Sequence, residues 1–390
     1  MVNDYFQFLD YGGTLYYYLF EFANFSFLGL LALYTYKIGL INLNSLIVWL
    51  AIFFTPLVFN YLLFSPYLFG DQFLYSGEAF LLKTNGQSLY QMNHIDFASK
   101  ILGSIPLPNF MTVTSLAFSN KLLLFLTFLW FKRYFDDENK ILLFFLVPSL
   151  LLYSSLALRE TLIIIFSILF LISMIKNKYL LALIFLYPIY VLKLQMFAFL
   201  SLYFVAKVIF RAHKSNKHAA FFVLSALVGS FILESEILTV VNQFRIGFAA
   251  ENFRVDGGGT SYAAWNLYGD DIAQALQILT IQEAIIKSII NLPQILLLPM
   301  PWNWTSLFHA FQTIESIFLV CLFVYISIKN KNYKNNEFIL LSIVLLLSLM
   351  LLGLVMANEG TFVRYRFTLF YPFLLAALYI FRNKTNFSKF

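Results

Sequence analysis

The sequence predicts an all-α integral membrane protein, a polytopic transmembrane helical bundle of about 11 spans plus one re-entrant or interfacial segment. Its 390 residues are 61% hydrophobic and only 12% charged. The mean hydropathy is +0.78. A soluble domain carries roughly twice that charged fraction, about 25%. Apolar stretches of about 20 residues, long enough to cross a bilayer as a helix, recur along the chain.

The candidate spans follow one another from end to end. Several in the middle are shorter than the roughly 20 residues of a straight crossing, so we expect tilted or broken helices there. The spans are predicted at residues 15–36, 45–64, 112–131, 141–158, 161–175, 179–192, 196–210, 219–240, 307–328, 338–357 and 365–381.

Short basic loops predict the orientation of the chain. "FKRYFDDENK", "KNK", "RAHKSNKH", "KNKNYK" and "RNKTNFSK" are rich in Lys or Arg, as cytoplasmic loops are. A regular alternation of the spans satisfies all of them, with the N-terminus outside and the C-terminus in the cytoplasm. It requires that "IIKSIINLPQILLLPMPW" does not cross fully. Pro293, Pro299 and Pro301 disfavour one straight helix there, so we expect a re-entrant or interfacial segment.

Composition also limits the classes of function. Cys321 is the only cysteine, which excludes an internal disulfide and a cysteine-rich metal site. The net charge of +6 follows from the positive-inside rule and does not indicate nucleic-acid binding. No cofactor and no metal is expected. Abundant Phe, Tyr, Ile, Asn and Lys suggest an AT-rich, bacterial coding sequence, hence a multi-pass protein of the cytoplasmic (inner) membrane.

Two long outer loops, residues 65–111 and 241–306, are where function is expected. In "FGDQFLYSGEAFLLKTNG", Asp71 directly follows a glycine, and Tyr75 lies about one helical turn further on. Apolar residues at 73–74 and 79–82 predict an amphipathic helix at the membrane surface. Asp71 is a candidate general base towards a sugar hydroxyl, and Tyr75 a candidate substrate contact. The alternative for Asp71 is an N-cap of that helix.

A tight outer turn, "SSLALRETL", carries Arg159 and Glu160 almost at membrane depth, where an unpaired charge is costly. An arginine in this position can bind a lipid phosphate through two parallel hydrogen bonds. It can also pair with Glu160 and only join helices, and both interpretations remain open. Lys193, in "VLKLQMF", occupies a similar outer turn and is a further candidate substrate contact.

The second long loop contains "NQFRIGFAAENFRVDGGGTSYAAWNLYGDD". Three consecutive glycines at 257–259 allow the backbone to approach a ligand closely or to adopt positive φ. No GK[ST] follows, so the run is not a phosphate-binding loop of the Walker type. Arg254 is a candidate phosphate contact, and Tyr262 and Trp265 offer rings on which a sugar could stack. A flexible turn is the alternative.

The stretch "NEGTFVRYRF" precedes the last span and is predicted to face outward, where the positive-inside rule disfavours arginine. Arg364 and Arg366 are therefore candidate phosphate ligands, and Glu359 is a second candidate catalytic carboxylate. If the helix already covers both arginines, their side chains diverge by roughly 200°. Anchoring to lipid headgroups is the alternative. Together, arginines for a phosphate leaving group and a carboxylate for an acceptor hydroxyl suit transfer of a lipid-linked sugar.

A family resemblance points the same way. The motifs "FGDQFLYSGEAFLLKTNG", "PSLLLYSSLALRETL", "RVDGGGTSYAAW", "LPMPWNW" and "NEGTFVRYRFTLFYPFLL" resemble bacterial enzymes of surface-polysaccharide assembly. That group includes O-antigen and capsule repeat-unit polymerases and GT-C glycosyltransferases. The resemblance implies a GT-C-like fold and undecaprenyl-linked donors at the outer face. It also implies that Asp71 is the general base. The arginines that it implies as diphosphate ligands are Arg159, Arg254, Arg364 and Arg366. The second aspartate that many GT-C enzymes place beside the first is missing.

We therefore expect a glycosyltransferase that polymerises undecaprenyl-diphosphate-linked oligosaccharide repeat units. One alternative is a GT-C enzyme that adds a single sugar from a polyprenyl monophosphate. Another is a lipid-glycan flippase or transporter, although such proteins place charges midway along helices and the charges here gather at one face. The expected partners are a polyprenyl-linked glycan, the lipid bilayer and a chain-length regulator, and no nucleic acid.

Overall fold

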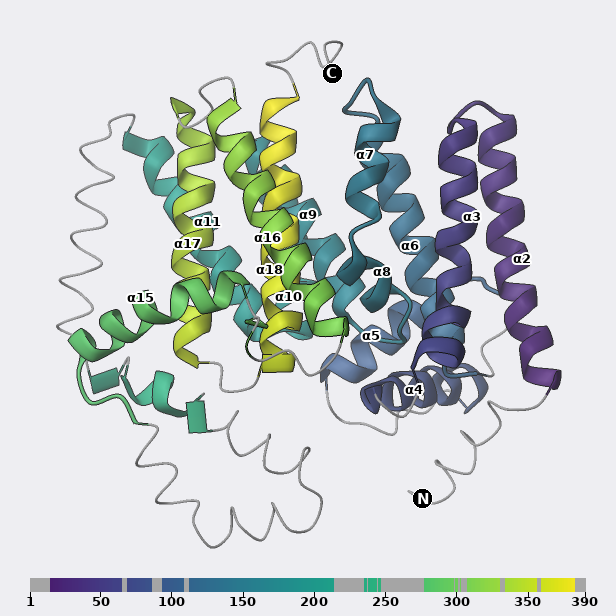
Figure 1. Ribbon diagram of the computed structural model, residues 1–390, viewed down its shortest axis with the longest axis horizontal. Helices are drawn as coiled ribbons and strands as arrows, with labels where there is room; N and C mark the ends of the chain where they lie inside the picture. The colour runs from purple at the N-terminus through teal and green to yellow at the C-terminus, as the bar shows by residue number, and fades with distance from the viewer. Residues whose placement is uncertain are drawn as a thin grey trace, which may run out of the picture. The chain divides into compact units, whose positions relative to one another are not determined.

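The computed structural model contains only helices and connecting loops over the residues that it describes, and no strand occurs among them (Figure 1). The predicted all-α class is confirmed for this part of the chain. The described residues are 15–64, 69–85, 93–108, 112–213, 235–236, 238–243, 245–246, 277–297, 299–300, 302, 307–329, 334–355 and 359–382.

The chain divides into two compact units. Unit 1 comprises residues 1–198 and 378–390, and unit 2 comprises residues 199–377. One boundary falls inside helix α11 (Leu194–His213) and the other inside helix α18 (Glu359–Phe381). Unit 1 is therefore built from two segments that lie far apart in the sequence.

Several described helices have the length and composition of membrane spans. Four are long and apolar enough to cross a bilayer: Leu19–Lys37, Leu43–Leu63, His309–Ile328 and Asn336–Val355. Three shorter helices are also apolar: Glu160–Ile175, Tyr179–Leu192 and Leu194–Ile209. These helices support a membrane protein. The total of about 11 spans stays a prediction.

The outward faces of these helices carry large apolar side chains. Leu30 is 66% exposed, Leu62 75% and Leu180 76%. Phe318 is exposed as well. Contact of many such side chains with water would be unfavourable, whereas contact with lipid chains is not. The pattern is the one expected of helices whose outer faces meet a bilayer.

Unit 1 begins with α2 (Leu15–Lys37) and α3 (Leu43–Leu57), close to the first two predicted spans. α3 contains Pro56 and continues as a short π-helical segment, η2 (Val58–Leu63). Proline removes one helical hydrogen bond and crowds the preceding turn, which explains the altered winding. Nδ2 of the buried Asn60 donates to the carbonyl oxygens of Pro56 (3.0 Å) and Ser155 (2.8 Å). Asn60 thereby ties the irregular turn to the chain around residue 155.

The span predicted at residues 141–158 is not one continuous helix in the structure. The structure divides it into α7 (Glu138–Phe145) and α8 (Pro148–Ser154). Val147 has φ −57° and ψ 124°, outside the helical region. A residue before proline is pushed out of the helical conformation, and proline itself is favoured at the first position of a new helix. The prediction of one continuous span at residues 141–158 is therefore wrong, because Pro148 interrupts the helix. The interruption agrees with the expectation of tilted or broken helices in the middle of the chain.

An aromatic cluster forms the core of unit 1. Trp49 on α3 lies with its ring centroid 4.9 Å from that of Phe125 and 5.4 Å from that of Phe128, both on α6 (Ser115–Lys132). Phe145 on α7 lies 6.1 Å from Trp49. All four side chains are fully buried. Buried aromatic pairs contribute beyond the area that they remove from solvent, so this cluster fixes α3, α6 and α7 against one another.

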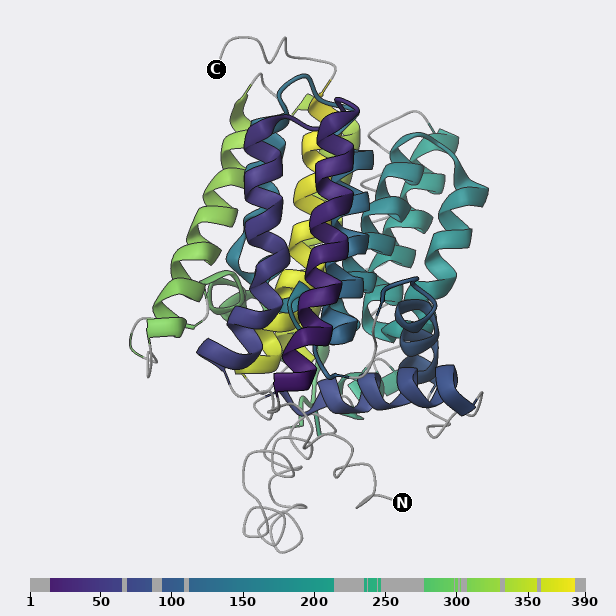
Figure 2. The same ribbon diagram turned by 90° about the vertical axis from the view of Figure 1, so that its right-hand side faces the viewer.

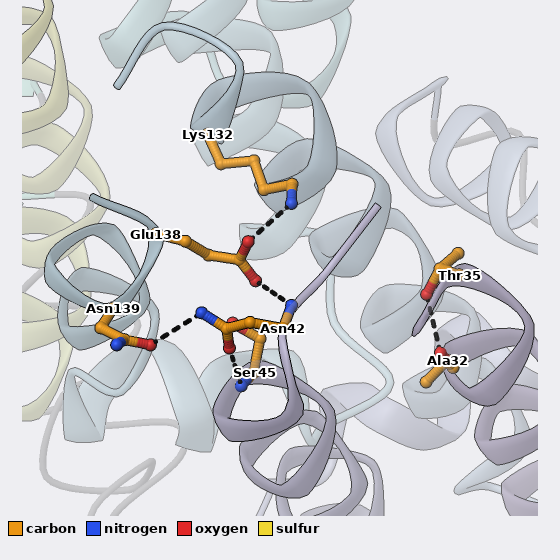
Figure 3. A network of polar contacts seen from close by, with 7 residues as sticks. All are labelled: Ala32, Thr35, Asn42, Ser45, Lys132, Glu138 and Asn139. Carbon is orange, nitrogen blue, oxygen red and sulfur yellow. Dashed lines mark hydrogen bonds and ion pairs between the residues drawn. The ribbon is translucent and has the colours of Figure 1, made fainter. Parts of the chain in front are cut away.

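A polar network joins the α2–α3 turn to the loop after α6 (Figure 3). Glu138 accepts hydrogen bonds from the Nζ of Lys132 (2.8 Å) and from the backbone N–H of Asn42 (3.1 Å). The Asn42 side chain accepts from the N–H of Ser45 (2.8 Å) as the N-cap of α3, and donates to Asn139 (3.1 Å). The predicted cytoplasmic turn and the predicted cytoplasmic loop thus lie at the same end of unit 1.

The α9–α10 hairpin completes most of unit 1. Helix α9 (Glu160–Ile175) and helix α10 (Tyr179–Leu192) match the predicted spans at 161–175 and 179–192 within one residue. They pack against one another along the hairpin. Asn177 in the "KNK" turn has φ 58°, a left-handed conformation that asparagine tolerates better than most residues. The short connection explains why the two helices are antiparallel neighbours.

In unit 2, α15 (Ile281–Leu297) packs against α16 (Leu307–Ile328) and α17 (Asn336–Val355). It runs across α17 rather than along it (Figure 1). Gly353 permits this crossing, because a Cβ added there would lie only 2.0 Å from Cδ1 of Ile295. Nδ2 of Asn291 donates to the Gly353 carbonyl (3.1 Å). The segment predicted as re-entrant or interfacial is thus a helix with Pro293 inside it, and its depth in a membrane stays a prediction.

Elsewhere in unit 2, Lys207 on α11 forms an ion pair with Glu337 in the first turn of α17, with an N–O distance of 2.8 Å. The predicted span at residues 219–240 lies almost entirely outside the described residues.

Candidate active site

Two short helices from the first long loop predicted to lie outside form a hairpin that lies across one end of unit 1 (Figures 1 and 2). They are α4 (Asp71–Asn85) and α5 (Asn93–Gly103). Gly103 of α5 packs against Ala79 of α4, and a Cβ added at Gly103 would meet the Cβ of Ala79 at 3.4 Å, an ordinary contact distance. The Ser99 hydroxyl donates to the carbonyl oxygen of Tyr75 (3.0 Å). A helix lies where the sequence predicts one after Asp71, and its position at the membrane surface stays a prediction.

The buried face of α4 is partly polar. Apolar positions were expected to face lipid, but the helix buries Gln72, Ser76 and Glu78 together with its apolar side chains. The Ser76 hydroxyl donates to the carbonyl of Val113 (3.0 Å), just before α6. A buried polar side chain is costly unless it has partners, so hydrophobic packing alone does not explain why these groups are buried. The buried side chains of α4 are thus both polar and apolar.

Asp71, His94 and Arg159 lie close enough to interact electrostatically. Asp71 is exposed in the first turn of α4, His94 is half-buried in the first turn of α5, and Arg159 immediately precedes α9. The pKa of His94 is lowered to about 4, first by burial and then by the charge of Arg159, while the Asp71 carboxylate acts in the opposite direction. The imidazole is consequently neutral at pH 7, with one nitrogen able to accept a proton. The structure brings together two predicted site residues and adds a histidine.

The turn that carries Arg159 is held from two sides. Nδ2 of Asn120 on α6 donates to the carbonyls of Leu156 (2.9 Å) and Leu158 (3.0 Å). Oε1 of Gln72 on α4 accepts from the N–H of Ala157 (3.0 Å). Asn120 and Gln72 are fully buried, so these bonds are protected from competition with water. Arg159 therefore sits on a fixed turn.

Arg159 adds its charge to the N-terminus of α9. It is the N-cap residue, with φ −77° and ψ −11°, and its carbonyl accepts from the N–H of Ile163 (3.1 Å). The N-terminus of a helix carries a partial positive charge, so the two effects reinforce one another. The Nε atom is buried with no hydrogen-bond partner among the described residues, and the ion pairs of the described residues do not include Arg159. Glu160, buried in the first turn of α9, offsets part of this positive charge.

Two further predicted residues belong to the same unit. Tyr75 is on the buried face of α4, 3% exposed, and Lys193 is the C-cap residue of α10, also 3% exposed. α10 packs against α5, which carries His94, and against α9, which begins directly after Arg159. Their roles as substrate contacts stay predictions.

The remaining described candidates lie on α18, in unit 2. Arg366 is buried, and its guanidinium donates to the carbonyl of Ile295 at the end of α15 (3.0 Å) and to the hydroxyl of Ser316 on α16 (2.5 Å). Arg364 is half-exposed, as expected for side chains two positions apart on one helix. Arg366 thus joins three helices, and its role in phosphate binding stays a prediction. Glu359 is the first residue of α18, and only its backbone is described.

Three predicted residues, Arg254, Tyr262 and Trp265, lie outside the described residues. Within the described part of the chain, no group of three or more His, Cys, Asp or Glu side chains is arranged to hold a metal ion. Comparison of the chain with protein-family models, with curated proteins and with solved structures finds no match.

Sequence reasoning missed His94, Gln72 and Asn120. His94 is the only histidine of residues 65–111, the first long loop predicted to lie outside, and that position was the available signal. Gln72 and Asn120 lie in segments that read as an amphipathic helix and a membrane span, and a single amide in either carries no pattern of its own. Only their hydrogen bonds to residues 156–158 reveal their part in positioning Arg159.

Proposed function

We propose that this chain is a membrane glycosyltransferase that extends a polyprenyl-diphosphate-linked oligosaccharide, polymerising repeat units at the outer face of a bacterial cytoplasmic membrane. The observation that carries the proposal is the grouping of an exposed carboxylate, a neutral imidazole and an arginine on a hydrogen-bonded turn at one end of unit 1. Such a transfer needs a base that accepts the proton of the acceptor hydroxyl and a group that binds the anionic leaving group. The bundle of about 11 spans, its GT-C-like fold and the outside N-terminus belong to this proposal.

The reaction assigns a role to each group. The acceptor hydroxyl oxygen forms a bond to the anomeric carbon of the donor, and its proton passes to the Asp71 carboxylate. The bond between that carbon and the diphosphate oxygen breaks, and the diphosphate leaves with the electron pair. Arg159 and the N-terminus of α9 stabilise the negative charge that develops on the leaving group. His94, neutral beside Asp71, can orient the carboxylate or the hydroxyl.

The test compares surface glycan in a deletion strain complemented with the wild-type gene or with a variant. Asp71→Asn and Arg159→Gln should each reduce long-chain glycan by at least about 100-fold, since each removes a group that acts in the transition state. Asp96→Asn and Lys100→Gln are the matched controls. These residues form an ion pair of 2.6 Å on the same hairpin, and we expect normal glycan when either is changed.

The glycan pattern of the deletion strain separates the alternatives. Single repeats on the lipid carrier are expected for a polymerase. Loss of one sugar from every repeat would point to a transferase that uses a polyprenyl monophosphate. Accumulation of lipid-linked repeats in the inner leaflet would point to a flippase. Normal long-chain glycan in membranes that contain folded Asp71→Asn and Arg159→Gln protein would overturn the proposal.

A further inference from the structure

The end of unit 1 opposite to the α4–α5 hairpin carries a cluster of two cations and two tyrosines, which we call the cation–tyrosine cluster. It consists of Tyr134 after α6, Lys176 at the end of α9, Tyr379 in the last turn of α18, and Arg382 directly after α18. These residues come from three parts of the sequence. Their grouping is therefore a property of the tertiary structure.

Both cations contact both rings. The Nζ of Lys176 donates a hydrogen bond to the hydroxyl of Tyr134 (2.8 Å) and lies 4.4 Å from the Tyr134 ring centroid and 5.5 Å from that of Tyr379. The Cζ of Arg382 lies 3.5 Å from the Tyr379 centroid and 5.4 Å from that of Tyr134. The two rings meet edge to face at 5.0 Å. Cation–π contacts of this kind hold positive charge at a chosen place.

Among the described residues, the neighbouring carboxylates pair with other cations. Glu138 pairs with Lys132 at 2.8 Å, and Asp137 pairs with Lys140 at 3.2 Å. The ion pairs of the described residues include neither Lys176 nor Arg382. Two like charges brought to the same rings repel one another, so a bridging anion would stabilise the arrangement. Asp136, the other acidic residue of this loop, is exposed to solvent.

Position and hydrogen-bonding capacity indicate what kind of anion fits. Lys176 follows the end of the apolar helix α9, and Arg382 follows the apolar C-terminal half of α18 at the same end of unit 1. The end of an apolar span is where the headgroup layer of a bilayer begins. Tyrosine is enriched at that depth. Arg382 uses one N–H to reach the carbonyl of Tyr379 (3.0 Å), and Lys176 uses one to reach Tyr134, which leaves other donors for a phosphate.

We propose that the cation–tyrosine cluster is a binding site for the phosphate of an anionic membrane lipid, of the phosphatidylglycerol type, in the leaflet that meets the basic loops. Arg382 and Lys176 donate to the phosphate oxygens, and the two tyrosines keep both cations at headgroup level. This site lies away from Asp71, His94 and Arg159, and the proposal does not depend on the proposed function.

Lipid retention by the purified full-length chain tests this site. Native mass spectrometry of the protein released from detergent, titrated with phosphatidylglycerol, measures the affinity of the first lipid bound. The double variant Lys176→Gln/Arg382→Gln should lose on the order of 10-fold or more in that affinity. The control Arg133→Gln/Lys178→Gln removes the same charge from exposed residues at the same end and should bind as the wild type does.

Equal loss in the control would overturn the proposal, because it would show attraction by net charge alone. Equal binding by the cluster variant and the wild type would also overturn it. Phosphatidylcholine, which carries no net charge, should bind at least several-fold more weakly than phosphatidylglycerol. Competition by millimolar inorganic phosphate with no preference for the lipid would show a free-phosphate site and would contradict a lipid site.

A second pair of variants guards against misfolding. Lys176→Arg keeps the charge and should retain the lipid. Tyr134→Phe keeps the ring but removes the hydroxyl that holds Lys176, so the affinity should fall by a few-fold while the helix content by circular dichroism stays unchanged. Full binding by Tyr134→Phe together with full binding by the double variant would exclude any contribution of the cluster.

Discussion

At the scale of single residues, the environment of a side chain matters more than its type. Arg159 and Arg366 are both arginines predicted to bind phosphate, yet their surroundings differ. Arg366 donates to Ile295 and Ser316 inside unit 2, whereas Arg159, at the start of α9, acts electrostatically on His94, as Asp71 does. A guanidinium already committed to protein acceptors has fewer donors left for a ligand. Arg159 is therefore the stronger candidate of the two.

The shifted pKa of His94 gives a prediction about its neighbours. Arg159→Gln removes a charge that lowers this pKa, so the pKa should rise above about 4; Asp71→Asn removes an opposing charge, so it should fall. Ring-labelled histidine NMR measures both shifts in a chain with His213, His218 and His309 replaced by Gln. Shifts of the same sign in both variants, or none, would contradict the grouping.

The same shift sets a pH window for stability. The unfolded chain takes up the proton on His94 near pH 6.5, well before the folded chain does. Protonation of His94 therefore leaves the free energy of unfolding unchanged above about pH 6.5 and lowers it as the pH falls from there towards about 4.

At the scale of elements, the places where helices begin and end organise unit 1. Asn42 caps α3, Asp137 caps α7, and Pro148 opens α8. Glu138 connects two of these ends, since it bonds both Lys132 and the N–H of Asn42. The polar network in Figure 3 therefore fixes the α2–α3 turn against the loop between α6 and α7.

Removing this connection should lower stability. Glu138→Ala leaves Lys132 and the Asn42 N–H without their carboxylate, and we expect a loss of about 1–2 kcal/mol in the free energy of unfolding. Thermal unfolding followed by intrinsic fluorescence in detergent measures it. The neighbouring exposed Asp136→Ala is the control and should unfold at the wild-type temperature. Equal midpoints for the two variants would show that the network does not stabilise unit 1.

At the scale of the whole molecule, unit 1 has two chemically different ends. One end carries the α4–α5 hairpin with Asp71, and the other carries the α2–α3 turn, the loop after α6 and the cation–tyrosine cluster (Figures 1 and 2). The described basic loops of unit 1, which are expected in the cytoplasm, lie at the second end. This arrangement agrees with the predicted alternation of the spans.

The orientation follows as a prediction. In a Cys321→Ser background, Ser104→Cys beside α5 should react with a membrane-impermeant maleimide in intact spheroplasts, because that end is expected outside. Asp136→Cys in the loop after α6 should react only after the membrane is broken. Both cysteines are placed at exposed positions. Labelling in the reverse order would reverse the orientation, and labelling of both in intact spheroplasts would contradict the crossing of the helices between them.

Local features of the sequence were enough to predict a membrane protein and the approximate bounds of most described helices. Helices α9, α10, α16 and α17 end within a few residues of the predicted spans, because a long apolar segment is a local feature that shows wherever it occurs. The helix after Asp71 was found for the same reason, from its local periodicity.

The tertiary structure alone decided which polar groups meet. His94 is 23 residues from Asp71 and 65 from Arg159, so no periodic pattern could place the three together. The same holds for Asn120 and Gln72 around the turn before α9, and for Lys176 with Arg382. Contacts between distant segments depend on how whole helices pack, and packing is set by all their side chains at once. That is why the candidate site emerged only from the folded chain.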